Sequence, residues 1–74
     1  MNSKPLTVAV RPETARFYKD RSPLGYWEIR VLNSRGRSRV IGTASKGPEA
    51  DNIVRFLTHS PPGVHQAYLA LITP

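Results

Sequence analysis

The chain contains no cysteine and few acidic residues, and these two shortages exclude several classes of protein. Without cysteine there is no disulfide framework and no cysteine-based zinc site, which fits a reducing compartment. Aspartate and glutamate total five against eleven lysines and arginines, so the net charge is +6 and the pI is about 10.6. A field of this sign attracts polyanions: nucleic acid, an acidic protein surface or an anionic membrane.

Long apolar runs are also missing from the sequence. No stretch approaches the roughly 20 apolar residues that span a bilayer. The N-terminal "MNSKPLTVAV" has one lysine and a short apolar run without a convincing cleavage site, so we interpret it as mature protein and expect a cytoplasmic location. The 74 residues suffice for one domain. We expect a flexible arm over residues 1–5 and a single α+β domain over residues 6–74.

Signatures of catalysis and metal binding are absent as well. The two histidines, His59 and His65, are separated by an "SPPG" turn, and a zinc site needs three or four ligands. No pair of acids has a spacing suited to acid–base work. There is no glycine-rich phosphate loop, no GxSxG motif and no cysteine nucleophile. We therefore expect no enzyme activity, no metal and no cofactor.

Short β-rich segments between turn residues predict an antiparallel sheet. In "YWEIRVL" the alternation places Trp27, Ile29 and Val31 on one face, and this is the clearest strand. The clusters "DRSPLG", residues 20–25, and "NSRG" read as loops, the second closing a hairpin with Gly36 at a position of positive φ. Four segments are predicted as strands: residues 6–10, 14–19, 26–32 and 37–44.

The hairpin register follows from which side chains it buries. If residues 33–36 are all loop, Ile29 lies opposite Val40 on the core face, and Arg30 faces Arg39 on the solvent side. A register shifted by one residue places Val40 beside Arg30 and Arg39 beside Val31 on the core face, which is costly. We therefore predict the four-residue loop.

The segment "SKGPEADNIVRFLTHS", residues 45–60, predicts a helix. Pro48 suits its first position, and the buried stripe follows the i, i+3, i+4, i+7 spacing, with Phe56 widening it. Its members are Ala50, Ile53, Val54 and Leu57. The last segment, "VHQAYLALI", is predicted as a final strand, with a helix as the alternative. The fold class is α+β: a small antiparallel sheet of three to five strands with one α-helix packed on one face.

Basic residues concentrate in the strands and in the hairpin "LNSRGRSRV". Between residues 16 and 39 seven basic residues stand against two acids, and Tyr18 and Tyr26 lie nearby as possible stacking partners for bases. Trp27 and Phe56 are predicted to belong to the core. We expect the arginines of the hairpin to line the sheet face that the helix leaves open. The candidate nucleic-acid-binding residues are Arg16, Lys19, Arg21, Arg30, Arg35, Arg37 and Arg39.

The N-terminal "MNSKPLTVAV" ahead of a sheet-and-helix body, together with the basic hairpin "NSRGRSRV", resembles the small RNA-polymerase-binding regulators of bacteriophages, of the type encoded by a lytic Xanthomonas phage. The resemblance implies a protein that binds host RNA polymerase, inhibits initiation or promotes antitermination, and holds a basic face near DNA or RNA. An exposed β-branched edge also invites a partner's strand. The candidate partner-binding residues are Leu6, Thr7, Val8, Ala9 and Val10.

Two other functions remain open at this point. One is a stand-alone nucleic-acid-binding module, which should bind DNA or RNA with a steep dependence on salt. The other is a phage-borne inhibitor of bacterial CRISPR machinery. Such inhibitors often mimic nucleic acid with acidic surfaces, so the positive charge of this chain argues against that function.

Overall fold

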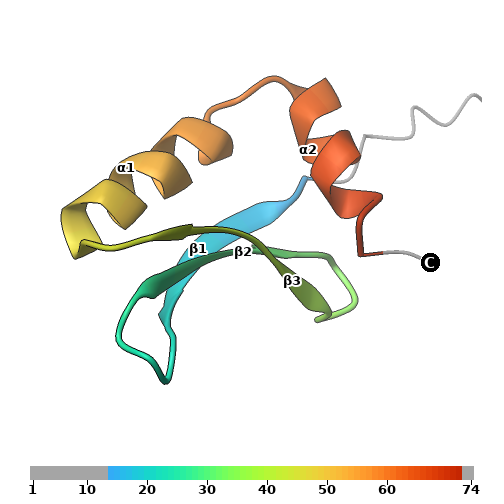
Figure 1. The fold of residues 1–74 in the computed structure, drawn as a ribbon. Coiled ribbons are helices and arrows are strands. Elements are labelled where there is room, and N and C mark those ends of the chain that lie inside the picture. Colours follow the sequence, from blue (N-terminus) through green and yellow to red (C-terminus); the bar gives the residue numbers. More distant parts are fainter. Residues whose placement is uncertain (1–13, 73–74) are drawn as a thin grey trace, which may run out of the picture.

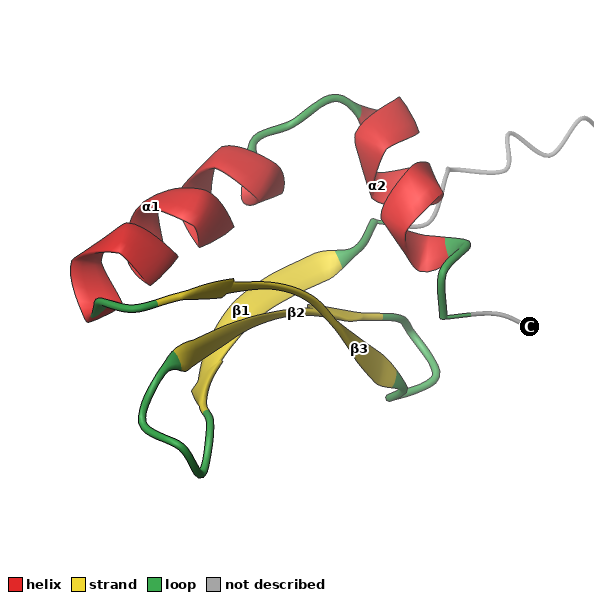
Figure 2. Ribbon diagram, viewed as in Figure 1, coloured by secondary structure: helices red, strands yellow, loops and turns green. Residues whose placement is uncertain are grey.

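The computed structural model describes residues 14–72, which form three strands followed by two helices (Figure 1). The strands pair antiparallel in the order β1-β2-β3, and both helices lie on the same side of this sheet (Figure 2). This confirms the predicted small α+β fold. The predicted arm over residues 1–5 and the predicted strand over residues 6–10 lie outside the described residues. The elements are β1 (Arg16–Arg21), β2 (Trp27–Leu32), β3 (Ser38–Ala44), α1 (Gly47–Thr58) and α2 (Pro62–Leu69).

The helix α1 forms where the sequence predicts it. Pro48 is its second residue, where the missing N–H of proline has no intrahelical partner to lose. Ala50 and Leu57 are buried, and Ile53 and Val54 are half buried. These four side chains form the predicted stripe, and the stripe packs on the sheet.

The segment after the loop is a second helix, so the predicted final strand is wrong and its helical alternative is correct. The helix α2 begins at Pro62, in the first turn that proline favours. His65 and Leu69 are buried, while Val64 and Tyr68 are half buried beside them. Burial at i and i+4 is the periodicity of a helix, because a strand would bury every second residue. Packing of this face on the sheet outweighs the strand preference of the β-branched residues at the ends of the segment.

The register of β2 and β3 differs from the predicted one. Arg30 pairs with Val40 and Val31 pairs with Arg39, which is the register that the sequence argument rejects. A bulge then intervenes, because Ile29 pairs with Gly42 and leaves Ile41 as the extra residue. Arg30 and Arg39 therefore lie on opposite faces of the sheet.

A contact in the turn and a contact with the chain after α2 accompany this register. The Asn33 N–H donates to the Arg37 carbonyl at 2.9 Å, so Asn33 and Arg37 close a three-residue loop in place of the predicted four-residue one. Arg39 lies near the end of the sheet and remains exposed, and its Nη1 donates to the Leu71 carbonyl at 2.7 Å. The guanidinium thus avoids the core, and the bulge returns Ala44 to the buried face.

The core lies between the sheet and the two helices. Ile29 and Val31 on the central strand and Ala50 on α1 are 1%, 0% and 0% exposed. Trp27, which the sequence places in the core, packs against it but is half buried. The other buried apolar residues are Ala15, Phe17, Ala44, Leu57 and Leu69.

His65 attaches α2 to the start of the sheet. Its ring is 5% exposed, and Nδ1 accepts a hydrogen bond from the Ala15 N–H at 3.1 Å. The ring also meets Phe17 edge to face, with the centroids 5.1 Å apart, and Tyr68 meets Phe17 in the same way at 5.7 Å. The histidine therefore joins residues 50 positions apart in the chain and is a core residue with a satisfied polar atom.

Candidate nucleic-acid interface

The seven basic residues predicted to bind nucleic acid do not share one face of the sheet. Because Lys19 pairs with Ile29, and Arg21 with Trp27, the side chains of Lys19 and Arg21 lie on the face that carries the helices. The Lys19 ammonium is 2.8 Å from the Asp51 carboxylate on α1 and 4.5 Å from the centre of the Trp27 ring. The Arg21 guanidinium lies 5.0 Å from the same ring. These two cations stack on Trp27, and Lys19 also links the sheet to α1.

Arg30 lies at the centre of the face that the helices leave uncovered. Its Nε donates to Glu28 Oε1 at 3.1 Å and lies 3.9 Å from an Asp20 oxygen, while its Nη1 donates to Ser38 Oγ at 3.1 Å. The hydrogen bond that Arg30 donates to Glu28 raises the pKa of Arg30, and the electrostatic attraction of Glu28 and Asp20 adds to the effect. The guanidinium is therefore permanently charged and held in one orientation.

The remaining predicted arginines gather where β2 turns into β3. Arg16 on β1 pairs with Leu32, the last residue of β2, and so lies at the same end of the sheet as the hairpin. All the arginines at this end are exposed, and none forms an ion pair with a residue between positions 14 and 72. We call this group the basic end; its members are Arg16, Arg35, Arg37 and Arg39.

The turn fixes where the hairpin arginines stand. Asn33 Oδ1 accepts hydrogen bonds from the backbone N–H groups of Arg35 at 3.0 Å and Arg37 at 2.9 Å. Gly36 has φ +82°, a conformation that side-chain-bearing residues rarely adopt. Asparagine and glycine thus shape the loop locally, and the arginines project from a turn with a defined backbone.

The sequence analysis does not predict the exposed apolar surface around Phe56. The Phe56 side chain is 76% exposed, so the predictions that it widens the buried stripe and joins the core are wrong. It lies about 60° around α1 from Ile53, at the margin of the stripe. The helix period alone does not say whether a residue at this margin is covered, because that depends on the neighbouring elements.

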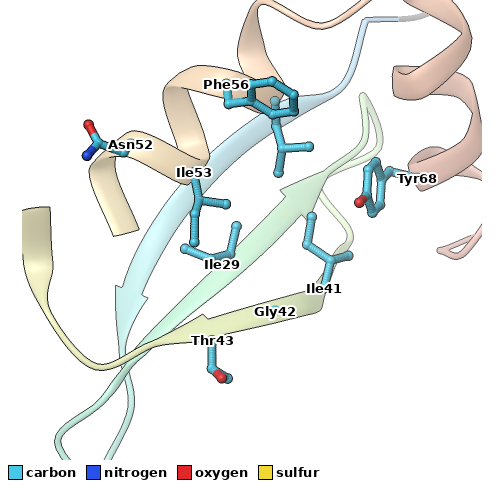
Figure 3. A pocket seen from close by; sticks show the side chains of 9 residues that line it. Ile29, Ile41, Gly42, Thr43, Asn52, Ile53, Phe56 and Tyr68 are labelled. Carbon is cyan, nitrogen blue, oxygen red and sulfur yellow. The ribbon is translucent and has the colours of Figure 1, made fainter. Parts of the chain in front are cut away.

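Two hollows flank Phe56. One has a volume of about 410 Å³ and lies between α1, β3 and Tyr68 of α2; Ile29, Ile41 and Ile53 form its wall (Figure 3). The other, of about 480 Å³, lies between α1 and the start of α2. Exposed aromatic side chains beside apolar hollows are typical of surfaces that bind other proteins.

Neither a candidate metal site nor a membrane-spanning helix is found among the described residues. Residues 14–72 contain no group of three His, Asp or Glu side chains placed to hold a metal ion. No helix within the same range is long and apolar enough to cross a membrane. The predicted partner-binding residues 6–10 lie outside the described range, so their role stays a prediction.

Comparison with known proteins returns no relative. No protein-family model, no curated protein and no solved structure matches the chain. The function must therefore be argued from the chain's own surfaces.

Proposed function

We propose that this protein is a non-enzymatic nucleic-acid-binding module whose basic end contacts the phosphate backbone. The supporting observation is that Arg16, Arg35 and Arg37 lie exposed at one end of the sheet without an acidic partner among residues 14–72. Like charges at one end of a small sheet repel each other, and at 0.1 M salt this repulsion is screened only beyond about 10 Å. The phosphates of a nucleic-acid backbone would relieve that repulsion, and the counterions condensed on the nucleic acid would be released on binding, which favours the complex.

The salt dependence of binding tests this function. Each phosphate contact contributes about 0.9 to the slope of log affinity against log salt on duplex DNA, so three to four arginines predict a slope of about −3. We expect that value when fluorescence anisotropy follows a labelled duplex DNA from about 50 to 200 mM KCl. A slope near zero, or no binding to duplex DNA or single-stranded RNA at the lowest salt, would contradict the proposal.

A second candidate function is suggested by the surface around Phe56. We propose that the module acts on a bacterial RNA polymerase complex, as the resemblance to phage regulators implies, with Phe56 docking on the enzyme. The basic end then contacts upstream DNA or emerging RNA. Phe56 lies on α1, on the helix side of the fold, and the arginines lie at the hairpin, so one module can hold both partners at once.

Polymerase capture separates this second function from the first. Purified bacterial RNA polymerase should be retained by the immobilised protein and lost with Phe56→Ser, because an exposed aromatic anchor contributes most of such a contact. Leu24→Ser is the matched control: Leu24 is 84% exposed, in the loop between β1 and β2. Equal retention by both variants would exclude Phe56 as the anchor. Retention of a purified CRISPR nuclease complex, and not of polymerase, in a parallel experiment would favour the third function considered above.

A further inference from the structure

The face of the sheet opposite the helices is uncovered throughout the part of the chain that the structure describes (Figure 2). Strand pairing places Tyr18, Arg30 and Val40 side by side across its centre. Tyr18 is half buried and Val40 is 38% exposed. Arg16, Leu32 and Ser38 form the next row toward the hairpin. Two rows, each containing one arginine beside apolar or uncharged side chains, thus lie next to each other on this face.

The charge on this face changes sign along the strands. Asp20 and Glu28 pair with each other at the end far from the hairpin. Arg16 lies on this face at the hairpin end, and Arg30 lies between; Arg39 pairs with Val31 and so lies on the helix face, which contradicts the expectation that the hairpin arginines line the open face. A polyanion is therefore attracted to the hairpin half of the face and repelled from the far half, which orients it relative to the strands.

The contacts of Arg30 position its guanidinium without using all its donors. Nε is bonded to Glu28 and Nη1 to Ser38, so two of the five N–H groups have partners. The side chain is 27% exposed. Carboxylates that fix a guanidinium on an open face leave its outer N–H groups ready for a planar pair of acceptors.

We propose that this uncovered face enters the major groove of B-form DNA and that Arg30 reads the O6 and N7 acceptors of a guanine there. This rests on the proposed nucleic-acid-binding function and names its substrate. Three strands about 4.8 Å apart span about 10 Å, and the major groove is about 12 Å wide. Arg16 lies on this face at its β1 edge, toward the hairpin, and reaches a phosphate on one wall of the groove.

Duplex DNA fits this face better than RNA does. Single-stranded RNA needs several exposed aromatic rings for stacking. Within the three strands, Tyr18 is the one aromatic side chain on this face, and it is half buried; Tyr26 lies just before β2, at the acidic end. Double-stranded RNA has a major groove too deep and narrow for side chains to read. The major groove of B-form DNA admits strands directly.

The first test uses chemical footprinting on duplex DNA. The protein selects bound sequences from a random duplex pool, and the selected duplex is then treated with dimethyl sulfate. This reagent methylates guanine N7 in the major groove and adenine N3 in the minor groove. We expect protection of guanine N7 at one or two positions and unchanged reaction at adenine N3. Protection of adenine N3 alone, or of neither atom, overturns the inference.

The second test uses Arg30 itself. The unaltered protein should bind the selected duplex about 10- to 100-fold more tightly than a duplex in which the protected guanine is replaced by another base. In Arg30→Ala the affinities for the two duplexes should be equal. Arg30→Lys should also lose this discrimination, because lysine keeps the charge but not the planar fork. Arg55→Ala, on the helix α1, is the control that should retain it. Undiminished discrimination in both Arg30 variants overturns the assignment.

Folding and binding outcomes keep the two proposals separate. Circular dichroism reports whether Arg30→Ala still folds. If Arg30→Ala is unfolded, Val40→Glu is used in its place: it puts a carboxylate on the same face and should abolish the protection of guanine N7. Persistent protection in Val40→Glu contradicts the inference. No binding to any duplex by the unaltered protein removes both the module function and the groove assignment. Binding without N7 protection removes the groove assignment alone.

Discussion

Replacing His65 with alanine should lower the free energy of unfolding by about 3 kcal/mol, which combines the loss of a buried ring with an unsatisfied N–H at Ala15. A domain of this size has a total stability of about 3–5 kcal/mol, so only about 0–2 kcal/mol should remain and the urea midpoint should fall sharply. The ring is 5% exposed, and its Nδ1 is the acceptor for the Ala15 N–H at 3.1 Å. Urea denaturation followed by the fluorescence of Trp27 measures the effect.

Two conservative variants divide this loss into its parts. His65→Phe keeps an aromatic ring against Phe17 but removes the acceptor, so the remaining loss reports the orphaned N–H, about 1–3 kcal/mol. His65→Asn keeps an acceptor and loses the ring packing. His59→Ala, at an exposed residue after α1, should change stability by less than about 0.5 kcal/mol. A loss under about 1 kcal/mol in His65→Ala would show that α2 is not held by this contact.

Reversing two charges at the hairpin should remove nucleic-acid binding while the fold remains. Arg35→Glu with Arg37→Glu places two carboxylates where the proposed function places phosphates, and we expect at least a roughly 30-fold loss of affinity for duplex DNA at low salt. Both side chains are exposed and have no ion pair within residues 14–72, so unfolding should be unaffected. Anisotropy and denaturation measured on the same preparation check both statements.

A matched variant separates position from net charge. Lys46→Glu with Arg55→Glu also changes the charge by −4, from +6 to +2, but at the two ends of α1. This control should lose less than about 5-fold in affinity, because only the general field is weaker. Equal losses in the two double variants would mean that net charge alone attracts the polyanion and that the basic end has no special role.

Charge reversal at Arg30 or Arg39 would not separate binding from stability, although the sequence alone gives no reason to exclude these two arginines. In the structure Glu28 and Asp20 surround the Arg30 guanidinium, so Arg30→Glu would bring three carboxylates together. Arg39 donates to the Leu71 carbonyl and supports the end of the chain that follows α2. Their replacement would mix stability with binding.

Local patterns account for the elements that the sequence predicts well. The alternation of Trp27, Ile29 and Val31 and the stripe on α1 are set by residues close in the chain, and both are confirmed. The turn is local too, since Asn33 and Gly36 shape it through their own backbone contacts. Periodicity and turn chemistry need no knowledge of distant residues, which is why these elements can be read directly.

One error is local: the hairpin loop has three residues and not the predicted four, which shifts the register of β3 by one residue. The other errors depend on packing between segments. The bulge at Ile41 shifts the register once more, and no local signal marks it. The segment after Pro62 has an ambiguous local pattern, and burial of His65 and Leu69 against the sheet decides for a helix. Phe56 stays exposed because no described element covers its side of α1. Each of these other outcomes depends on packing between elements rather than on propensity within one.

The sequence by itself determined that this is a small, strongly basic α+β domain with an arginine-rich hairpin. Only the tertiary structure decided which cations are available to a partner. Lys19 and Arg21 stack on Trp27, Arg30 is fixed by Glu28, and Arg39 donates to the Leu71 carbonyl, whereas Arg35 and Arg37 are exposed and have no ion pair among the described residues. The physical reason is that net charge is a sum over the residues and needs only the sequence. The partner of each charged side chain depends on the sheet face it lies on, on the strand register and on which element packs beside it, and these are set by folding.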